Sequence, residues 1–242
     1  MINKTLKNRY FKDLEKLKKF NKYYYDKNEP KVSDAEYDKL KQNILKFEKD
    51  YPTIKKNNSP SKNVGYKPSK NFKKKKHRER MLSLSNIFNK EDLINFEKKI
   101  NNFLDLNTDK FEYSVEPKID GISASLTYKN GKLIYGLSRG DGSEGELITE
   151  NLKTIKDIPK SISNKNFPKD IDIRGEVFIE NKDFEQLKDK FANPRNAASG
   201  SLRHKDPNET KKIPLRFLAY TFGYFDKNKF KKQSDFIDSL KE

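Results

Sequence analysis

The chain contains no cysteine and no long apolar run, and both absences narrow the classes of protein to which it can belong. Without cysteine it can form neither a disulfide nor a thiolate zinc site. No stretch approaches the ~20 apolar residues that a membrane-spanning helix needs. The first seven residues, MINKTLK, lack the apolar core of a secretion signal, so we expect a cytoplasmic protein.

Arginine is scarce, although the chain is strongly basic. The formal net charge is +17, yet only eight of the 53 basic residues are Arg. A charge of this sign favours binding to a polyanion, because Lys and Arg neutralise phosphates. The excess of Lys, with many Asn and Ile, is also typical of nucleotide bias in a coding sequence. The charge is therefore consistent with a nucleic-acid partner without requiring one.

Hydrophobic periodicity predicts two helices within residues 1–50. The apolar stripe of the first consists of Leu6, Tyr10, Leu14 and Leu17. The stripe of the second consists of Tyr37, Leu40, Ile44 and Phe47. Ser33, with Glu36 three residues later, is a capping box that marks the start of the second helix.

A polar link with several prolines runs from about residue 52 to residue 71. We place a domain boundary there, which gives a small helical domain at residues 1–70 and a second domain at residues 71–242. The four lysines at residues 73–76 are interpreted as a solvated strap, with phosphate contact as the alternative.

The second domain begins with a helical stripe and continues with strand patterns. The stripe consists of Leu93, Phe96, Ile100 and Phe103. Strands are predicted at residues 111–115, 123–128, 132–138, 171–179 and 215–222. Asn130 and Gly131 form a two-residue turn typical of a type I′ hairpin. Helices followed by hairpins indicate an α+β fold with a mainly antiparallel sheet.

Residues 116–121, with the sequence EPKIDG, are the most informative motif. On a strand, Glu116, Lys118 and Asp120 all project to one side. A lysine amine that loses its proton, through burial or a nearby cation, can attack an electrophile. A surface strand with compensating charges is the alternative for this motif taken alone.

Three further motifs carry side chains suited to a nucleotide. Asp34, Tyr37 and Asp38 share one helical face, where a cationic aromatic ligand would explain two neighbouring carboxylates. An ordinary solvent-facing surface with Tyr37 at the edge of the core is the alternative. Arg139 opens a glycine-rich turn that suits a ribose or phosphate, although a tight turn needing positive φ explains the glycines equally well. Glu176 lies on a strand and suits a ribose hydroxyl or a metal ion.

Residues 191–203, FANPRNAASGSLR, are nearly free of lysine within a lysine-rich chain. Arg195 and Arg203 are two of the eight arginines, and arginine kept in such a background suggests bidentate phosphate contacts. A helix that starts after Pro194 would add backbone donors for an anion.

Taken together and in this order, the motifs resemble the N-terminal part of a bacterial-type NAD-dependent DNA ligase. The resemblance covers residues 20–225 approximately and implies a helical domain that grips nicotinamide mononucleotide, followed by a nucleotidyltransferase (adenylation) domain. It assigns to the nicotinamide mononucleotide site Tyr24, Tyr25, Asp34, Ala35, Glu36, Tyr37 and Asp38. It assigns to the adenosine pocket the segment at residues 81–84, which includes Ser83 and Leu84.

The resemblance also assigns roles around the EPKIDG motif. Lys118 is the implied nucleophile, Glu116 lies near the adenine, and Asp120 belongs to the same motif. Arg139 and Glu176 are implied contacts to ribose and NAD. Arg195 and Arg203 are implied to serve catalysis or to contact DNA phosphate.

The implied reaction begins with attack by Lys118 on the adenylyl phosphorus of NAD. Nicotinamide mononucleotide leaves, a lysyl-AMP forms, and AMP then passes to the 5′-phosphate of nicked DNA for sealing in replication and repair. The amine must be neutral, Mg²⁺ and basic side chains must offset the phosphate charge, and the leaving group must be held in line.

In the family, two later motifs each donate a lysine, and further DNA-binding modules follow. None of these fits after residue 222, so we expect a fragment, a split gene product or a reduced relative, with an adenylation domain that is C-terminally incomplete. A second chain or a C-terminal region would then supply the later lysines. A non-catalytic remnant that binds NAD or DNA is the main alternative. An ATP-using relative is disfavoured, because that branch lacks a nicotinamide-binding domain.

Overall fold

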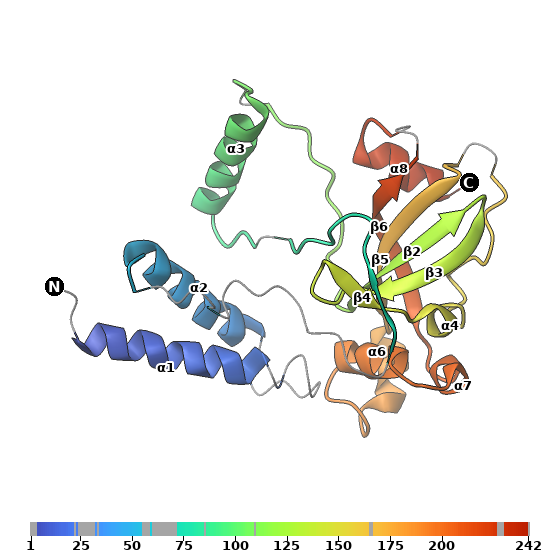
Figure 1. The fold of residues 1–242 in the computed structure, drawn as a ribbon, viewed down its shortest axis with the longest axis horizontal. Coiled ribbons are helices and arrows are strands. Elements are labelled where there is room, and N and C mark those ends of the chain that lie inside the picture. Colours follow the sequence, from blue (N-terminus) through green and yellow to red (C-terminus); the bar gives the residue numbers. More distant parts are fainter. Residues whose placement is uncertain are drawn as a thin grey trace.

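The computed structural model describes residues 4–21, 23, 32, 34–54, 59, 72–84, 86–108, 110–164, 167–226 and 230–241. In chain order the elements are α1 (Lys4–Asn21), α2 (Asp34–Asp50), β1 (Lys74–Lys76), α3 (Lys90–Leu104), β2 (Ile122–Lys129), β3 (Lys132–Ser138), β4 (Glu144–Glu146), α4 (Thr149–Leu152), β5 (Asp170–Phe178), α5 (Asn181–Phe184), the 3₁₀ helix η3 (Glu185–Leu187), α6 (Pro194–Leu202), α7 (Pro207–Lys211), β6 (Arg216–Phe225) and α8 (Gln233–Ser239). Helices combined with antiparallel strands confirm the predicted α+β class. Figure 1 shows the helical pair first, then the sheet with its helices.

Helices α1 and α2 pack against each other through the apolar stripes that the sequence predicts. Tyr10, Leu14 and Leu17 of α1 are buried together with Ile44 of α2. The Tyr10 ring stacks on Phe47 of α2, with 4.4 Å between ring centroids. Each helix thus buries one face against the other, which is how a short amphipathic helix gains most of its stability.

The helical region departs from the expectation at one position. Leu6 is exposed, so the buried stripe of α1 begins one turn later, at Tyr10. The expected capping residue, Ser33, lies outside the described residues, as does most of the link at residues 52–71. No helix of the part of the chain that the structure describes is long and apolar enough to cross a membrane.

The main sheet has four antiparallel strands in the order β3-β2-β5-β6. The predicted hairpin joins β2 to β3, and its two turn residues, Asn130 and Gly131, have φ values of 48° and 74°. Positive φ at both positions is the signature of a type I′ turn. The four strands lie where the sequence predicts them, with ends that differ by a few residues.

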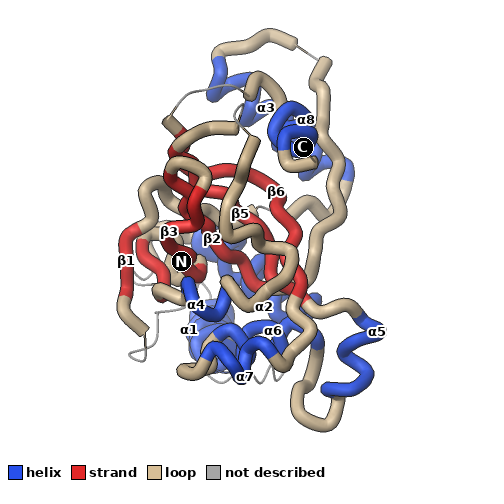
Figure 2. Tube along the Cα trace, turned by 90° about the vertical axis from the view of Figure 1, so that its right-hand side faces the viewer, coloured by secondary structure: helices blue, strands red, loops and turns tan. Residues whose placement is uncertain are grey.

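A large hydrophobic core holds the sheet to its helices. It combines sheet residues such as Leu126 and Val177 with Leu152 of α4, Ala197 of α6 and Phe236 of α8, all of them buried. Helices α6 and α7 lie at one end of the sheet and α8 lies at the other, and the two views agree on this arrangement (Figures 1 and 2). The sheet is therefore fixed at both ends.

The lysine run is a strand as well as a solvated strap. Lys74–Lys76 form β1, which pairs with β4 through Lys74 and Glu146, Lys75 and Gly145, and Lys76 and Glu144. All three lysines are exposed, as expected. The strand was not predicted, because lysine has a low strand propensity and the pairing depends on a segment some 70 residues away.

The prediction of a strand at residues 111–115 is wrong. Within the described residues, the segment at 110–120 has no regular secondary structure. An alternating pattern gives a strand only where a neighbour completes its hydrogen bonds, and β2 is already paired on both sides, by β3 and β5. Helix α3 forms as predicted, but none of its fifteen residues is buried. Figure 1 shows α3 lying away from the four-stranded sheet.

Candidate functional site

A cavity of about 1050 Å³ collects residues from α2, the sheet, α6, α8 and two connecting segments. Most of the residues that the sequence singles out line it. They are Tyr37, Asp38, Ser83, Leu84, Glu116, Lys118, Arg139, Glu176, Arg195 and Arg203. Motifs that are up to 166 positions apart in the chain therefore surround one space.

The segment that carries Lys118 differs from the expectation in its backbone. It is not a strand, so Glu116, Lys118 and Asp120 do not alternate on a pleated ladder, and all three are exposed. The segment joins the sheet at Gly121, where an added Cβ would lie 2.2 Å from the carbonyl oxygen of Val177. Only glycine allows this close approach, which brings the motif beside Glu176 on β5.

Glu176 is a half-buried carboxylate of the cavity wall. Its Oε2 accepts a hydrogen bond of 2.8 Å from the Ser123 hydroxyl. Burial raises the pKa of this carboxyl, while the Ser123 hydrogen bond and the positive charges of Arg195, Lys118 and Arg139 oppose that rise. The lysine and both arginines are thus near enough to act on it electrostatically.

Asp120 is held by helix α6, which lies between β5 and β6 in the chain. The Arg195 guanidinium donates to its Oδ1 at 3.0 Å. Helix α6 begins at Pro194, as predicted, and the side chain of its N-cap, Asn193, accepts from the backbone N–H of Asn196. The pair ties the segment with Lys118 to the end of the sheet at which α6 lies.

Arg203 lies against a carboxylate that the sequence analysis did not single out. Glu146 of β4 is 1% exposed, and the Arg203 Nε lies 3.3 Å from its Oε2. Both side chains line the cavity, with Ser199 of α6 beside them. A buried carboxylate is stabilised by such a cation, so Glu146 orients the arginine as well as balancing its charge.

The glycine-rich turn at residues 139–142 has the tight geometry that one of the two interpretations required. Gly140 and Gly142 have φ values of 57° and 88°. The turn also faces the cavity through Arg139, whose Nη1 lies 3.4 Å from the Ser83 hydroxyl. The glycines make the tight turn, and the turn presents Arg139 to the cavity.

His77 is hydrogen-bonded to this turn and to the residue that follows it. One ring nitrogen lies 3.0 Å from the Arg139 carbonyl oxygen, and the backbone N–H of His77 donates to Ser143. Burial lowers the pKa of the His77 imidazole, and the positive charge of Arg174 acts in the same direction. The neutral ring then acts as the donor to the carbonyl.

Two arginines fix residues 78–80, the segment that leads from β1 to residues 81–84. The Arg78 guanidinium binds Asp172 and Asp170, with 3.0 Å from its Nε to Asp172 Oδ2. Arg174 is buried and donates to the backbone carbonyl groups of Arg80 and Glu79. The segment that follows, with Leu84 and Ser83 exposed toward the cavity, thus starts from a rigid anchor.

Helix α2 contributes to the far wall of the cavity. Asp38 accepts a hydrogen bond of 3.1 Å from the Asn86 side chain. The Tyr37 hydroxyl donates to Asn21 of α1 at 2.6 Å, and its ring packs at the edge of the small core. Tyr37 therefore has the core-edge position of the alternative interpretation and also lines the cavity.

The other residues expected in the nicotinamide site are not part of the cavity wall. Some of them lie outside the residues that the structure describes. Glu36 is exposed and is absent from the cavity wall. Asp34 and Ala35 belong to the first turn of α2. Tyr24 and Tyr25 lie outside the described residues.

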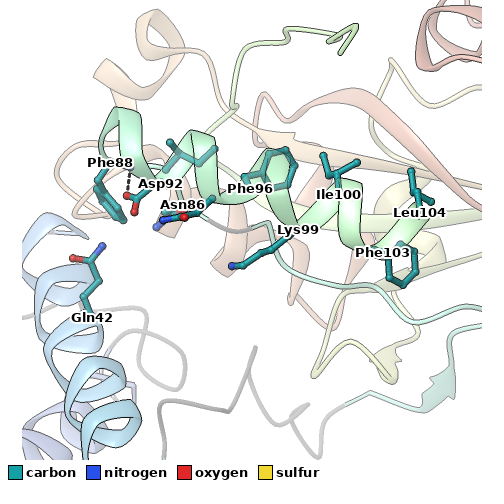
Figure 3. Close-up of a pocket in the computed structure, with 11 residues that line it drawn as sticks. Gln42, Asn86, Phe88, Asp92, Phe96, Lys99, Ile100, Phe103 and Leu104 are labelled. Carbon is teal, nitrogen blue, oxygen red and sulfur yellow. Dashed lines mark hydrogen bonds between the residues drawn. The ribbon is translucent and has the colours of Figure 1, made fainter. Parts of the chain in front are cut away.

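A second cavity, of about 830 Å³, lies along α3. Figure 3 shows Phe96, Ile100, Phe103 and Leu104 along the helix, with Gln42 of α2 near Phe88, before the start of α3. Apart from Asn86, it shares no residue with the large cavity. None of the predicted chemical groups lines it.

Several residues of the large cavity were missed by the sequence analysis. They are Glu146, Arg174, Asn196, Tyr220 and Gln233. Glu146 lies four positions after the glycine-rich turn, and Arg174 lies two positions before Glu176, so local signals existed for both. Tyr220 and Gln233 carry no local signal, because their place in the wall depends on how β6 and α8 pack.

Within the described ranges, no group of three or more His, Cys, Asp or Glu side chains is placed to hold an ion. Mg²⁺ is commonly bound through one or two carboxylates together with substrate phosphates. One or two carboxylates of the cavity, such as Glu176, fit a Mg²⁺ ion that phosphate groups help to hold.

Comparison with protein families accounts for nearly the whole chain. The family model described as the NAD-dependent DNA ligase adenylation domain matches residues 69–242. A second model, described as the DNA ligase-like N-terminal NAD⁺-binding domain, matches residues 3–65. The chain belongs to the NAD-dependent DNA ligase family.

Individual relatives agree with this membership, which confirms the resemblance noted in the sequence. A DNA ligase of Pelagibacter ubique is 61% identical over 242 residues, which are 100% of this chain and 36% of the relative. A DNA ligase of Parvibaculum lavamentivorans is 45% identical over 93% of this chain and 33% of its own length. One of Rickettsia canadensis is 46% identical over 94% and 34%. The chain thus spans about a third of the length of these curated relatives.

Proposed function

We propose that this chain takes up NAD and transfers its adenylyl group to Lys118, the first step of DNA ligation. One observation carries the proposal: Lys118, Glu176 and the three arginines Arg139, Arg195 and Arg203 line the same cavity as Asp38 of α2. A dinucleotide with a cationic nicotinamide needs cations for its phosphates and an anion for its ring, and this cavity offers both.

In the proposed step, the neutral Nζ of Lys118 attacks the adenylyl phosphorus. A P–N bond forms, the P–O bond to nicotinamide mononucleotide breaks, and the Nζ proton leaves to solvent or to a nearby base. Arg139 and Arg195 offset the charge on the phosphate oxygens, and the α2 face with Tyr37 and Asp38 holds the leaving group in line. Asp34, Ala35, Glu36, Tyr24 and Tyr25 belong to the same proposed nicotinamide site.

Mg²⁺ is part of the proposal as an ion that arrives with phosphate oxygens. Glu176 is the cavity carboxylate that would join those oxygens in binding it, or would accept from a ribose hydroxyl instead. When bound, such an ion would reduce the negative charge that opposes the attack by Lys118.

We also propose the division into a nicotinamide mononucleotide-binding domain at residues 1–70 and an adenylation domain at residues 71–242. The ranges of the two family models, 3–65 and 69–242, support a boundary near residue 70. Transfer of AMP to the 5′-phosphate of nicked DNA, with Arg195 and Arg203 on the phosphate, belongs to the same proposal. So does a second chain or further region that supplies the later lysines and the DNA-binding modules for replication and repair.

A second candidate is a module that binds NAD or DNA without turnover. The exposure of Lys118 and the irregular backbone around it favour this candidate, because an attacking amine needs a fixed position.

Intact-mass measurement after incubation with NAD and Mg²⁺ separates the two candidates. We expect the chain to gain the mass of one adenylyl group, Lys118→Arg to gain none, and the matched surface variant Lys129→Arg to behave like the parent. The same incubation with ATP tests the ATP-using alternative. Binding of NAD without any adduct would support the non-catalytic module, and an adduct that persists in Lys118→Arg would contradict the role of Lys118.

A further inference from the structure

Helix α2 contributes three side chains to the wall of the large cavity. They are Tyr37, Asp38 and Lys41. Lys41 is half-buried and lies one helical turn after Tyr37, so these two side chains share a face of α2. Lys41 is the cation of this wall, and it lies outside the motifs that the sequence points to.

The Lys41 ammonium is not engaged by the protein. In the part of the chain that the structure describes, it forms no hydrogen bond and no ion pair. Asp38, three residues earlier, has the opposite charge and the usual spacing for a helical ion pair. The Asp38 carboxylate instead accepts a hydrogen bond of 3.1 Å from the Asn86 side chain. The amine of Lys41 is therefore available to a ligand in the cavity.

The other cations of the cavity come from a different part of the chain. Basic residues outnumber acidic residues by seven to four in the cavity wall, and six of the seven lie within residues 80–203. Two of these six already bind carboxylates, since Arg195 pairs with Asp120 and Arg203 pairs with Glu146. An anion that lies against α2 thus has Lys41 as the one cation that this helix supplies to the described wall.

The three side chains match the three parts of nicotinamide mononucleotide in kind. The Tyr37 ring suits a cationic aromatic ring, and its hydroxyl is bound to Asn21 of α1. The Asp38 carboxylate suits the positive charge of that ring or the hydroxyl donors of the ribose. The phosphate is an anion, which Asp38 would repel and Lys41 would attract.

The proposed reaction increases the charge on this phosphate. As the Nζ–P bond forms at Lys118, the bond between the adenylyl phosphorus and the bridging oxygen breaks. The bridging oxygen keeps the electron pair, so the phosphate of nicotinamide mononucleotide gains one negative charge. A cation beside it then stabilises the transition state more than it stabilises bound NAD, which raises the rate of the step.

We propose that Lys41 binds the phosphate of nicotinamide mononucleotide and stabilises it as it leaves. The inference rests on the proposed function, because it takes nicotinamide mononucleotide to lie against α2. It adds to that function a cation for the leaving group, on a different helix from the arginines that offset the charge of the adenylyl phosphate. Its distinctive consequence is that recognition of this phosphate depends on Lys41.

The first test compares equilibrium binding of nicotinamide mononucleotide with that of nicotinamide riboside, which lacks the phosphate. The complete 242-residue chain should bind the mononucleotide at least about tenfold more tightly. Lys41→Gln should reduce this ratio to about threefold or less, and Lys41→Arg should keep most of it because the charge remains. The matched control is Lys39→Gln on the same helix, since Lys39 is exposed and outside the cavity wall. This control should keep the ratio of the parent.

The second test measures how fast the Lys118 adduct forms in a single turnover at saturating NAD, where the rate reports the chemical step. Lys41→Gln should slow this step about tenfold or more, whereas Lys39→Gln should keep the rate of the parent. A rate that Lys41→Gln leaves unchanged would overturn the role of Lys41 in the departure of the leaving group.

The binding results separate failure of the inference from failure of the proposed function. If the parent binds neither ligand, the proposed nicotinamide site falls together with the inference. If the parent binds both ligands equally, or if Lys41→Gln preserves the ratio, the inference is overturned and the nicotinamide site is not. An equal loss of ratio in Lys39→Gln would show that any positive charge on α2 suffices, so Lys41 would have no special role.

Discussion

The sheet body, residues 121–226, is well packed, whereas the outer segment, residues 82–120, buries few of its side chains. The sheet body contains most of the large core, and four of its strands pair in one antiparallel sheet. The outer segment contains α3, with no buried residue, and the irregular stretch that carries Lys118. Arg139, Glu176, Arg195 and Arg203 thus lie on the rigid part, whereas the proposed nucleophile lies on the part with few supports.

This difference indicates how the site is assembled. The groups proposed to bind phosphate are held by the core and the sheet. The proposed nucleophile, Lys118, lies on a segment held by a few polar links, among them Arg195 to Asp120 and Gln233 to Glu116. We therefore expect changes in the sheet body to alter stability and changes in the outer segment to alter function.

The largest loss of stability is expected from Arg78→Gln. The Arg78 guanidinium pairs with the buried Asp172, which also accepts from Thr127, and with Asp170. Removing one partner leaves an uncompensated buried carboxylate, which typically costs about 3–5 kcal/mol of unfolding free energy. Urea denaturation monitored by circular dichroism measures it.

The control for this variant is Arg216→Gln. Arg216 also binds two carboxylates, those of Asp157 and Glu180, but the side chain is 45% exposed. Its loss should be clearly smaller than that of Arg78→Gln. Equal losses of unfolding free energy would contradict the claim that the ion pairs of Arg78 hold its segment to β5.

Gly121→Ala should break the junction between the two regions. The new Cβ would meet the Val177 carbonyl oxygen at 2.2 Å, so backbone must move. Overpacking of this kind typically costs about 1–3 kcal/mol, and the shift displaces the segment with Lys118. We expect both a lower urea midpoint and the loss of the adenylyl adduct.

Gly200→Ala is the matched glycine control. An added Cβ there lies 3.1 Å from the edge of the Phe191 ring, a half-buried side chain that can yield. Alanine also favours a helix interior by up to about 1 kcal/mol relative to glycine. Stability equal to or above the parent is expected, and an equal loss in both variants would show that the junction is not special.

A smaller and pH-dependent effect is expected at His77. Because folding lowers the pKa of this imidazole, its contribution to stability is fully present above the ordinary value of 6.5 and is lost as the pH falls through the folded-state pKa. His77→Gln keeps an N–H donor for the Arg139 carbonyl but does not titrate. Between pH 7 and pH 5 the parent should lose more unfolding free energy than His77→Gln. Parallel pH profiles would contradict the assignment.

The smallest effect is expected on α3. Phe103 is 88% exposed, so Phe103→Ala removes little buried surface. The unfolding free energy should change by no more than about 0.5 kcal/mol. In contrast, Leu126→Ala in the sheet body should cost about 2–5 kcal/mol, because Leu126 is 1% exposed within the core. A large loss at Phe103 would show that the outer segment is packed after all.

Local patterns predicted most elements of the fold. The stripes of α1 and α2, the Asn130–Gly131 turn and the helix after Pro194 each depend on a few neighbouring residues. The structure has all of them, except that Leu6 of the α1 stripe is exposed. The strand at residues 111–115 failed because a strand also needs a partner, which alternation cannot supply. The lysine strand β1 was missed for the converse reason, since its partner β4 provides the pairing that its composition does not favour.

The candidate site also contains residues that local patterns predicted and residues that they missed. Residues within compact motifs, such as Lys118, Arg139 and Glu176, were predicted and line one cavity. Tyr220 and Gln233 were not, because a bulge in β6 and the docking of α8 bring them there. No periodicity within either segment encodes these long-range contacts.

Hydrogen–deuterium exchange with and without NAD tests most directly the claim that the dinucleotide joins the two regions. We predict slower exchange at residues 81–84 and 112–120 when NAD is bound, with little change along β2, which is already protected by its ladder. Slowing confined to residues 90–104, or no change at saturating NAD, would contradict the account.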